Sequence, residues 1–183
     1  MEIKNKIANP GPLGLLGFGM TTILLNLANL GVVDLTIVVI AMGIALGGLA
    51  QIIAGVLEFK SGNLFGGTAF TAYGFFWLSF VIIKVGIGGI LPADLISMGF
   101  YLLLWGIFTL FMTIGTIAHN TITKLVFGSL TLLFLTLAVA DFTGIGLITQ
   151  VAGGIGIITG LFAMYSAVGQ IVNHELGKNV LPL

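Results

Sequence analysis

A short motif with helix-start chemistry stands directly before the first long apolar segment, and its residues are Asn9, Pro10, Gly11, Pro12, Leu13 and Gly14. An asparagine side chain at this place can accept a backbone N–H of the first helical turn, and proline fits an early position where no N–H is needed. A helix N-terminus carries partial positive charge and suits an anionic group. The motif therefore predicts either a plain helix start or, if this end lies on a permeation path, an entrance for an anion.

Polar side chains also occur inside the apolar segments, where they are costly unless they face the bundle interior or a water-filled cavity. Five of them are candidates to line such a path: Thr21, Thr22, Asn26, Gln51 and Thr71. Gln51 shares one helical face with Gly47, Gly55 and Glu58, a spacing that equally favours a helix-packing seam. Glu58 comes at the end of its segment, where we expect a solvated anchoring residue.

The composition places the chain in a bilayer, because 58% of its 183 residues are hydrophobic, only 7% are charged, and the mean hydropathy is +1.22. The chain has no cysteine and no arginine, and it shows no cluster of metal ligands and no phosphate or cofactor motif. We expect no metal, no cofactor, no nucleic-acid partner and no enzymatic activity. A transported species would meet neutral groups, so the candidates are a small neutral solute or a small anion.

A helix needs about 20 apolar residues to cross the hydrocarbon core. Stretches of that length predict an all-α, single transmembrane domain over residues 1–183, with helices near 12–30, 35–57, 64–87, 95–117, 121–140 and 146–172. Two halves of three helices would form an inverted repeat. The lysine bias predicts that both termini are cytoplasmic, because Lys84 stands on one side and the other five lysines on the opposite side. No role follows for Lys84, His119 or His174.

The run from Asn9 to Leu15, continued by Gly17 to Thr22, resembles the signature of the acetate uptake transporter family, also called GPR1/FUN34/YaaH. The usual signature has alanine where this chain has Gly11. The similarity extends over nearly the whole chain, through the runs 41–43, 48–52, 54–55, 57–58, 62–63, 65–66, 68–71, 73–74, 105–106, 108–111 and 180–182.

The resemblance implies a homohexamer in the plasma or inner membrane, in which each protomer carries acetate and related short carboxylates such as succinate. Family members act as proton symporters or as anion channels. The family's hydrophobic constriction corresponds here to Phe18, Tyr73 and Leu130, and Ala163 corresponds to a position that influences which carboxylate passes. We expect the Tyr73 hydroxyl to donate a hydrogen bond to the substrate, which would offset part of its dehydration cost.

Three other classes remain as alternatives. A narrow channel for a neutral solute such as urea would also consist of six-helix subunits without fixed charges. A water or glycerol channel would require two facing Asn-Pro-Ala motifs, whereas this chain has one similar run, beginning at Asn9. A membrane scaffold that transports nothing would need only the glycine-rich packing.

Overall fold

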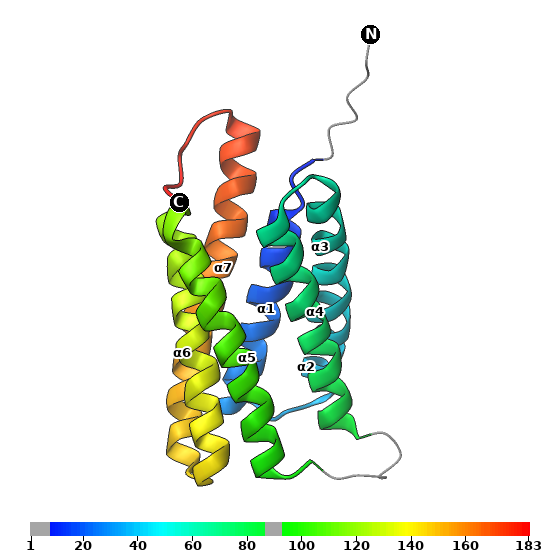
Figure 1. Ribbon diagram of the computed structural model, residues 1–183, viewed down its shortest axis with the longest axis vertical. Coiled ribbons are helices and arrows are strands. Elements are labelled where there is room, and N and C mark those ends of the chain that lie inside the picture. Colours follow the sequence, from blue (N-terminus) through cyan, green and yellow to red (C-terminus); the bar gives the residue numbers. More distant parts are fainter. Residues whose placement is uncertain (1–7, 87–92) are drawn as a thin grey trace.

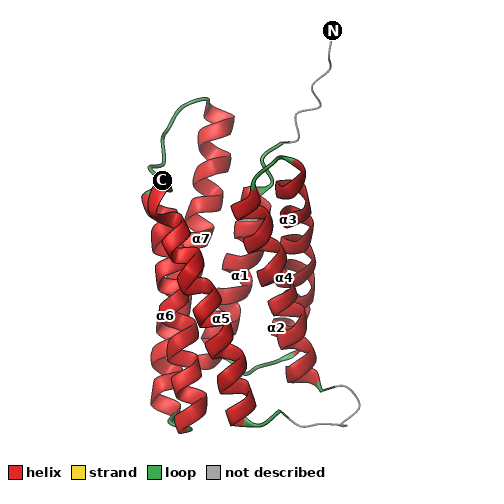
Figure 2. Cartoon of the chain, viewed as in Figure 1, coloured by secondary structure: helices red, strands yellow, loops and turns green. Residues whose placement is uncertain are grey.

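The computed structural model describes residues 8–86 and 93–183, and within them the secondary structure is helical, with no strand (Figure 2). The elements in chain order are α1 (Gly11–Asn29), α2 (Ile37–Met42), η1 (Gly43–Ala50), α3 (Gln51–Lys60), α4 (Leu64–Val85), α5 (Leu95–Gly115), η2 (Thr116–Ala118), α6 (Thr121–Thr143) and α7 (Gly146–Leu176). Because α2, η1 and α3 form one continuous span and η2 extends α5, six helices are long and apolar enough to cross a membrane.

The six predicted helices are confirmed, and the corrections concern their ends. The second span begins two residues later and ends three residues later than predicted, at Ile37–Lys60. The fifth ends at Thr143 rather than at residue 140, and the sixth continues to Leu176 rather than ending at 172. The residues added at these three C-terminal ends include polar and charged ones, so hydropathy alone places them outside the helix. The backbone nevertheless stays helical beyond the apolar part. The end predicted at 87 for the third helix lies outside the described residues; the structure gives a helix to Val85.

Four of the helices begin with a side-chain cap, which explains why the chain turns at those points. The side chains of Thr36, Asn63, Asp94 and Asn120 each accept a backbone N–H of the first turn that follows. Such a cap contributes about 1 kcal/mol to helix stability. At Asp94, the Ser97 hydroxyl and then the Ser97 backbone N–H lower the pKa of the carboxyl below its usual range.

The middle of the second span is a π-helix, η1, which is eight residues long. Such wide turns are rare and are frequently found at functional sites. Close packing surrounds it: a Cβ on Gly47 would lie 2.7 Å from the Trp77 ring, and one on Gly17 would lie 2.5 Å from the Leu46 carbonyl oxygen. The glycines therefore let α1 and α4 approach the second span at the distance of backbone contact.

The spans form two groups that meet along α1 (Figure 1). Within the first three spans α3 packs on α4, within the last three α6 packs on both α5 and α7, and α1 packs on both α7 and the second span. The first described residues and the C-terminus lie toward the same end of the bundle, which is also where α3 ends and α4 and α6 begin. Lys60, Lys124 and Lys178 belong to this end and Lys84 to the opposite end, whereas Lys4 and Lys6 lie outside the described residues.

Candidate functional site

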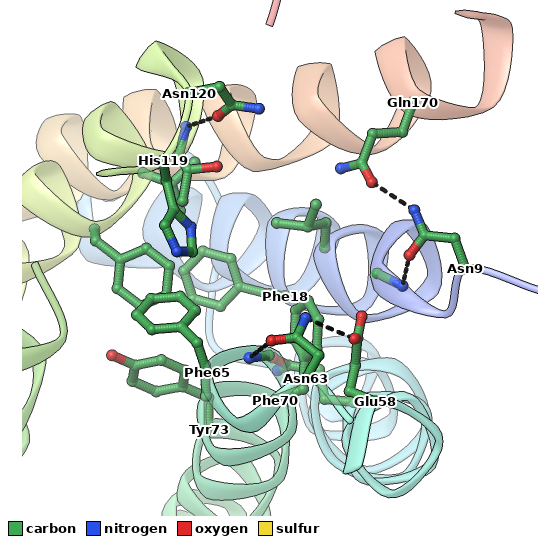
Figure 3. Close-up of a pocket in the computed structure, with 18 of the residues that line it drawn as sticks. Asn9, Phe18, Glu58, Asn63, Phe65, Phe70, Tyr73, His119, Asn120 and Gln170 are labelled. Carbon is green, nitrogen blue, oxygen red and sulfur yellow. Dashed lines mark hydrogen bonds between the residues drawn. The ribbon is translucent and has the colours of Figure 1, made fainter. Parts of the chain in front are cut away.

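A cavity of about 300 Å³ opens at the end of the bundle that carries the first described residues and the C-terminus, and we call it the vestibule (Figure 3). Its lining comes from α1, α3, α4, α6, α7 and the residues that join them: Asn9, Gly11, Leu15, Phe18, Gln51, Glu58, Asn63, Phe65, Gly66, Ala69, Phe70, Tyr73, His119, Asn120, Thr123, Val126, Phe127, Leu130 and Gln170. Asn9, Asn63, His119 and Asn120 are exposed and form the rim. The rim is thus polar, and the walls farther in are mainly apolar.

The motif at residues 9–14 forms one side of this rim. The Asn9 side-chain oxygen accepts the Gly11 N–H at 3.0 Å, and the Asn9 amide donates to Gln170 Oε1 at 3.0 Å, which links α1 to α7. The residue at the cap position is Pro10, not Asn9, so the predicted cap is corrected by one residue although its hydrogen bond forms. Asn9 and Gly11 line the vestibule, whereas Pro10, Pro12, Leu13 and Gly14 do not.

Gly14 has a packing role beside the vestibule. A Cβ added at Gly14 would lie 2.6 Å from the Phe70 ring of α4, so its absence lets that ring seat against α1. Pro12 occupies the second helical position of α1, where its missing N–H costs nothing. The motif therefore builds the helix start and the close contact beside the cavity, while Asn9 and Gly11 supply its polar surface.

Three buried side chains with large apolar parts line the vestibule. Phe18, Tyr73 and Leu130 come from α1, α4 and α6, and all three line the cavity and are buried. The Phe18 and Tyr73 ring centroids lie 6.2 Å apart. The residues expected from the resemblance to form a constriction are thus brought together, from three helices, at one place.

The Tyr73 hydroxyl has a different partner from the one expected. It donates to Thr109 Oγ1 of α5 at 2.9 Å, and Thr109 in turn donates to the Trp105 carbonyl oxygen at 2.7 Å. The Tyr73 ring packs against Phe108, Phe127 and other aromatic rings beside the vestibule. In the structure, the hydroxyl that was expected to donate to the substrate thus donates to Thr109.

The Tyr73→Phe variant should retain the acetate flux of the wild type and lose about 1 kcal/mol of stability, the net contribution of one hydrogen bond. Thr109→Val breaks the same bond from the other side and is the matched control. Thermal unfolding in detergent and flux in liposomes measure the two effects. A loss of flux in Tyr73→Phe that does not occur in Thr109→Val would show instead that the Tyr73 hydroxyl donates a hydrogen bond to the substrate.

Of the five polar candidates, only Gln51 lines the vestibule. It is fully buried, its amide donates to the Gly47 carbonyl oxygen at 2.7 Å, and its Oε1 atom has no hydrogen-bond partner. Thr21 donates to the Gly17 carbonyl oxygen and Asn26 to the Thr22 carbonyl oxygen. These bonds occupy the helix's own acceptors, as hydroxyl and amide groups in helices often do.

Thr22, Thr71 and Ala163 lie away from the vestibule; Thr22 and Ala163 are buried and Thr71 is half-buried. The hydroxyl oxygens of Thr22 and Thr71 have no hydrogen-bond partner, and Thr71 closely approaches Gly55 across the contact between α3 and α4. Ala163 is fully buried in the bundle on α7 and is not part of the cavity lining. The structure thus brings together Asn9, Gly11, Gln51 and the three residues expected to form a constriction, and leaves the other candidates in the packing between helices.

The exposure of Glu58 differs from what the sequence predicted. This side chain was expected to be solvated, but it is only 5% exposed and it lines the vestibule. His119 was assigned no role and also lines the cavity, with its ring centroid 4.6 Å from that of Phe65. Position at a helix end does not distinguish a solvated residue from one turned into a cavity, and the cap residue Asn63, which follows Glu58 by five positions, was the available signal.

The sequence comparison decides the family. Residues 2–182 match the GPR1/FUN34/yaaH family. The chain belongs to this family. A match over this length includes all six spans and the whole lining of the vestibule.

Relatives within the GPR1/FUN34/yaaH family include transporters from bacteria and fungi. The succinate-acetate/proton symporter SatP of Escherichia coli K12 is 51% identical over 97% of this chain and 96% of its own. The acetate permease A of Emericella nidulans is 34% identical over 97% of this chain and 66% of its own. A solved structure of the bacterial acetate channel SatP superimposes with a TM-score of 0.95 at 50% identity and covers 97% of this chain and 99% of that one.

Proposed function

We propose that this protein carries acetate and related short carboxylates such as succinate across the cell membrane, by proton symport or as an anion channel. The observation that carries the proposal is the full-length relationship to proteins named for succinate-acetate symport and acetate conduction, combined with a vestibule whose buried lining includes Phe18, Tyr73 and Leu130. Because those relatives are named for transport and conduction, we assign transport to this chain.

The apolar constriction selects by the cost of dehydration. Moving a neutral amide or hydroxyl out of water without a partner costs about 2–7 kcal/mol, and an isolated ionised carboxylate costs far more. A small acid with a single carboxyl group exposes the least polar surface to the three apolar side chains. Acetate is accordingly the preferred substrate in this proposal, and bulkier acids are disfavoured.

We place both termini and the mouth of the vestibule on the cytoplasmic side. Lys60, Lys124 and Lys178 gather at that end, whereas Lys84 lies at the other, and an excess of lysine marks the cytoplasmic end of short-loop membrane proteins. The assembly proposed from the family resemblance is a homohexamer in the plasma or inner membrane. Native mass spectrometry of the purified protein tests it, with a mass of six protomers expected.

A narrow pathway for a small neutral solute such as urea is the second candidate function. It is favoured by the amide side chains that surround the vestibule, which are Asn9, Gln51, Asn63, Asn120 and Gln170. Amides both donate and accept hydrogen bonds and so suit an uncharged polar solute.

Liposomes containing the purified protein separate the two functions. Labelled acetate should enter faster than into empty liposomes, and unlabelled acetate or succinate should compete while urea should not. An imposed pH gradient at clamped voltage, or a voltage at equal pH, then distinguishes symport from an anion channel. Uptake of labelled urea that acetate does not inhibit would instead support the second candidate.

A further inference from the structure

Glu58 places a buried carboxyl group in the wall of the vestibule. It is 5% exposed, and Asn63 Nδ2 donates to its Oε2 atom at 2.7 Å (Figure 3). Within residues 8–86 and 93–183 it forms no ion pair with a lysine or a histidine. A single amide N–H is therefore the hydrogen-bond donor that the described side chains give to its ionised form.

The second carboxyl oxygen of Glu58 belongs to a group of three oxygens around Gly11. A Cβ on Gly11 would lie 3.0 Å from Asn9 Oδ1, 3.3 Å from Glu58 Oε1 and 3.5 Å from Gln170 Oε1. Amide oxygens are acceptors only, and Glu58 Oε1 has no hydrogen-bond donor among the described residues. Oxygens around a carboxyl oxygen suit a protonated carboxyl, which can donate to them. The Glu58 oxygen that lacks a donor thus lies, with two amide oxygens, around the same glycine.

Among residues 8–86 and 93–183, few other titratable groups lie near this carboxyl. α1 has none along its whole length, and on α4 the Tyr73 hydroxyl donates to Thr109. The others described at this end of the bundle are His119 on the rim and a set on exposed positions, which are Lys60, Lys124, Tyr165, His174, Glu175 and Lys178. Among the described residues, Glu58 is consequently the acidic group of the vestibule lining.

Gln51 supplies a second acceptor on the same helix, two turns deeper than Glu58. Its amide nitrogen donates to the Gly47 carbonyl oxygen, so the side-chain atom without a hydrogen-bond partner is Oε1. A buried acceptor without a partner favours a ligand with an O–H group over a carboxylate, which has only acceptors. The walls beside the constriction therefore fit a neutral carboxylic acid better than its anion.

We propose that Glu58 is the proton acceptor of the vestibule, a role that rests on the function proposed above. A carboxylic acid crosses the constriction in its neutral form, with its O–H group received by Gln51 Oε1. In the vestibule its O–H bond breaks and an O–H bond forms on Glu58, so that R–COOH and the Glu58 carboxylate become R–COO⁻ and the Glu58 carboxylic acid. The anion leaves through the polar rim, and Glu58 returns its proton to the water. Transport in the opposite direction reverses these steps.

The test is the pH profile of labelled acetate flux into liposomes, at equal pH on both sides and above the flux into empty liposomes. Glu58→Gln should lower the flux at least tenfold, and the ratio of wild-type to variant flux should change with pH. Glu175→Gln makes the same chemical change on an exposed glutamate of α7 and should keep the ratio constant. Glu58→Asp retains a carboxyl group and should retain a pH-dependent profile at a lower rate.

Asn63→Asp tests the same site without removing the carboxyl group. Its side-chain oxygen can still cap α4 by accepting the Gly66 N–H, but the donor to Glu58 becomes a second acid. Like charges disfavour ionisation, so the midpoint of the pH profile should move about one unit to higher pH. This variant and Glu58→Asp carry the test even if Glu58→Gln fails to fold.

Three results separate the possible failures. A constant ratio of wild-type to Glu58→Gln flux across pH would overturn the role of Glu58 and leave acetate transport standing. An unmoved midpoint in Asn63→Asp would overturn it in the same way. A wild-type flux equal to that of empty liposomes would overturn the proposed function itself and this inference with it.

Discussion

Replacing Leu130 with alanine is expected to raise the flux of lactate relative to that of acetate by on the order of tenfold. Leu130 is 2% exposed and lines the vestibule beside Phe18 and Tyr73, so its truncation widens the place where the three side chains meet. A pocket that gains the volume of a few methylene groups discriminates less against a larger substrate, by about 1–3 kcal/mol for each group. Phe18→Ala should act in the same direction.

The matched control for this prediction is Leu132→Ala. Leu132 lies on the same helix but is 54% exposed, so its truncation leaves the vestibule unchanged. A buried leucine-to-alanine change lowers folding stability by about 2–5 kcal/mol, so less folded protein would reach the liposomes. The ratio of lactate flux to acetate flux does not depend on the amount of folded protein. If the ratio of lactate flux to acetate flux is the same in the wild type and in Leu130→Ala, Leu130 does not contribute to the selectivity of the pathway.

Gly156→Ala is expected to destabilise the protein by about 2–4 kcal/mol, because a methyl group there overpacks the contact between α7 and α1 and disturbs hydrogen bonds. An added Cβ would overlap the Asn26 side chain, which is buried, donates to the Thr22 carbonyl oxygen at 2.8 Å and accepts from Asn29 at 3.0 Å. Thermal unfolding in detergent measures the loss.

Gly154→Ala is the control for the same helix. No atom lies within 4 Å of the Cβ that this change would add, so the protomer can accept it, and the better helix propensity of alanine contributes up to about 1 kcal/mol. The double variant Gly156→Ala with Asn26→Ala should recover stability, because the overlapping side chain is gone. Equal unfolding temperatures for the two single variants would show that this contact does not limit the approach of α1 to α7.

The helices could be predicted from the sequence because the bilayer leaves few alternatives. Segments of about 20 apolar residues must be helical to satisfy their backbone groups. The capping residues Asn63, Asp94 and Asn120 then set three of the helix starts. The widened turns of η1 could not be predicted, since glycine-rich apolar sequence fits an α-helix and a π-helix equally well.

The site was predictable only in part. Phe18, Tyr73 and Leu130 were expected together because of the family resemblance, and the cavity unites them. Burial of Glu58 depends on the way α3 ends against α1 and α4, and the one local signal for it in the sequence is the cap residue Asn63, five positions later. The direction of the Tyr73 hydroxyl also depends on packing, since its partner Thr109 is 36 residues away and on another helix. Side-chain direction is set by such distant contacts, so the sequence supplies candidate residues without their partners.

The most direct test of the central claim, that carboxylates pass between Phe18, Tyr73 and Leu130, uses the absence of natural cysteine. In Leu130→Cys, the introduced thiol is the sole one, and benzyl methanethiosulfonate adds to it a neutral benzylthio group that is bulkier than the leucine side chain; mass spectrometry gives the modified fraction. Acetate flux in liposomes should fall at least tenfold on modification and return after reduction, while Leu132→Cys keeps its flux. Unchanged acetate flux through fully modified Leu130→Cys would contradict the claim.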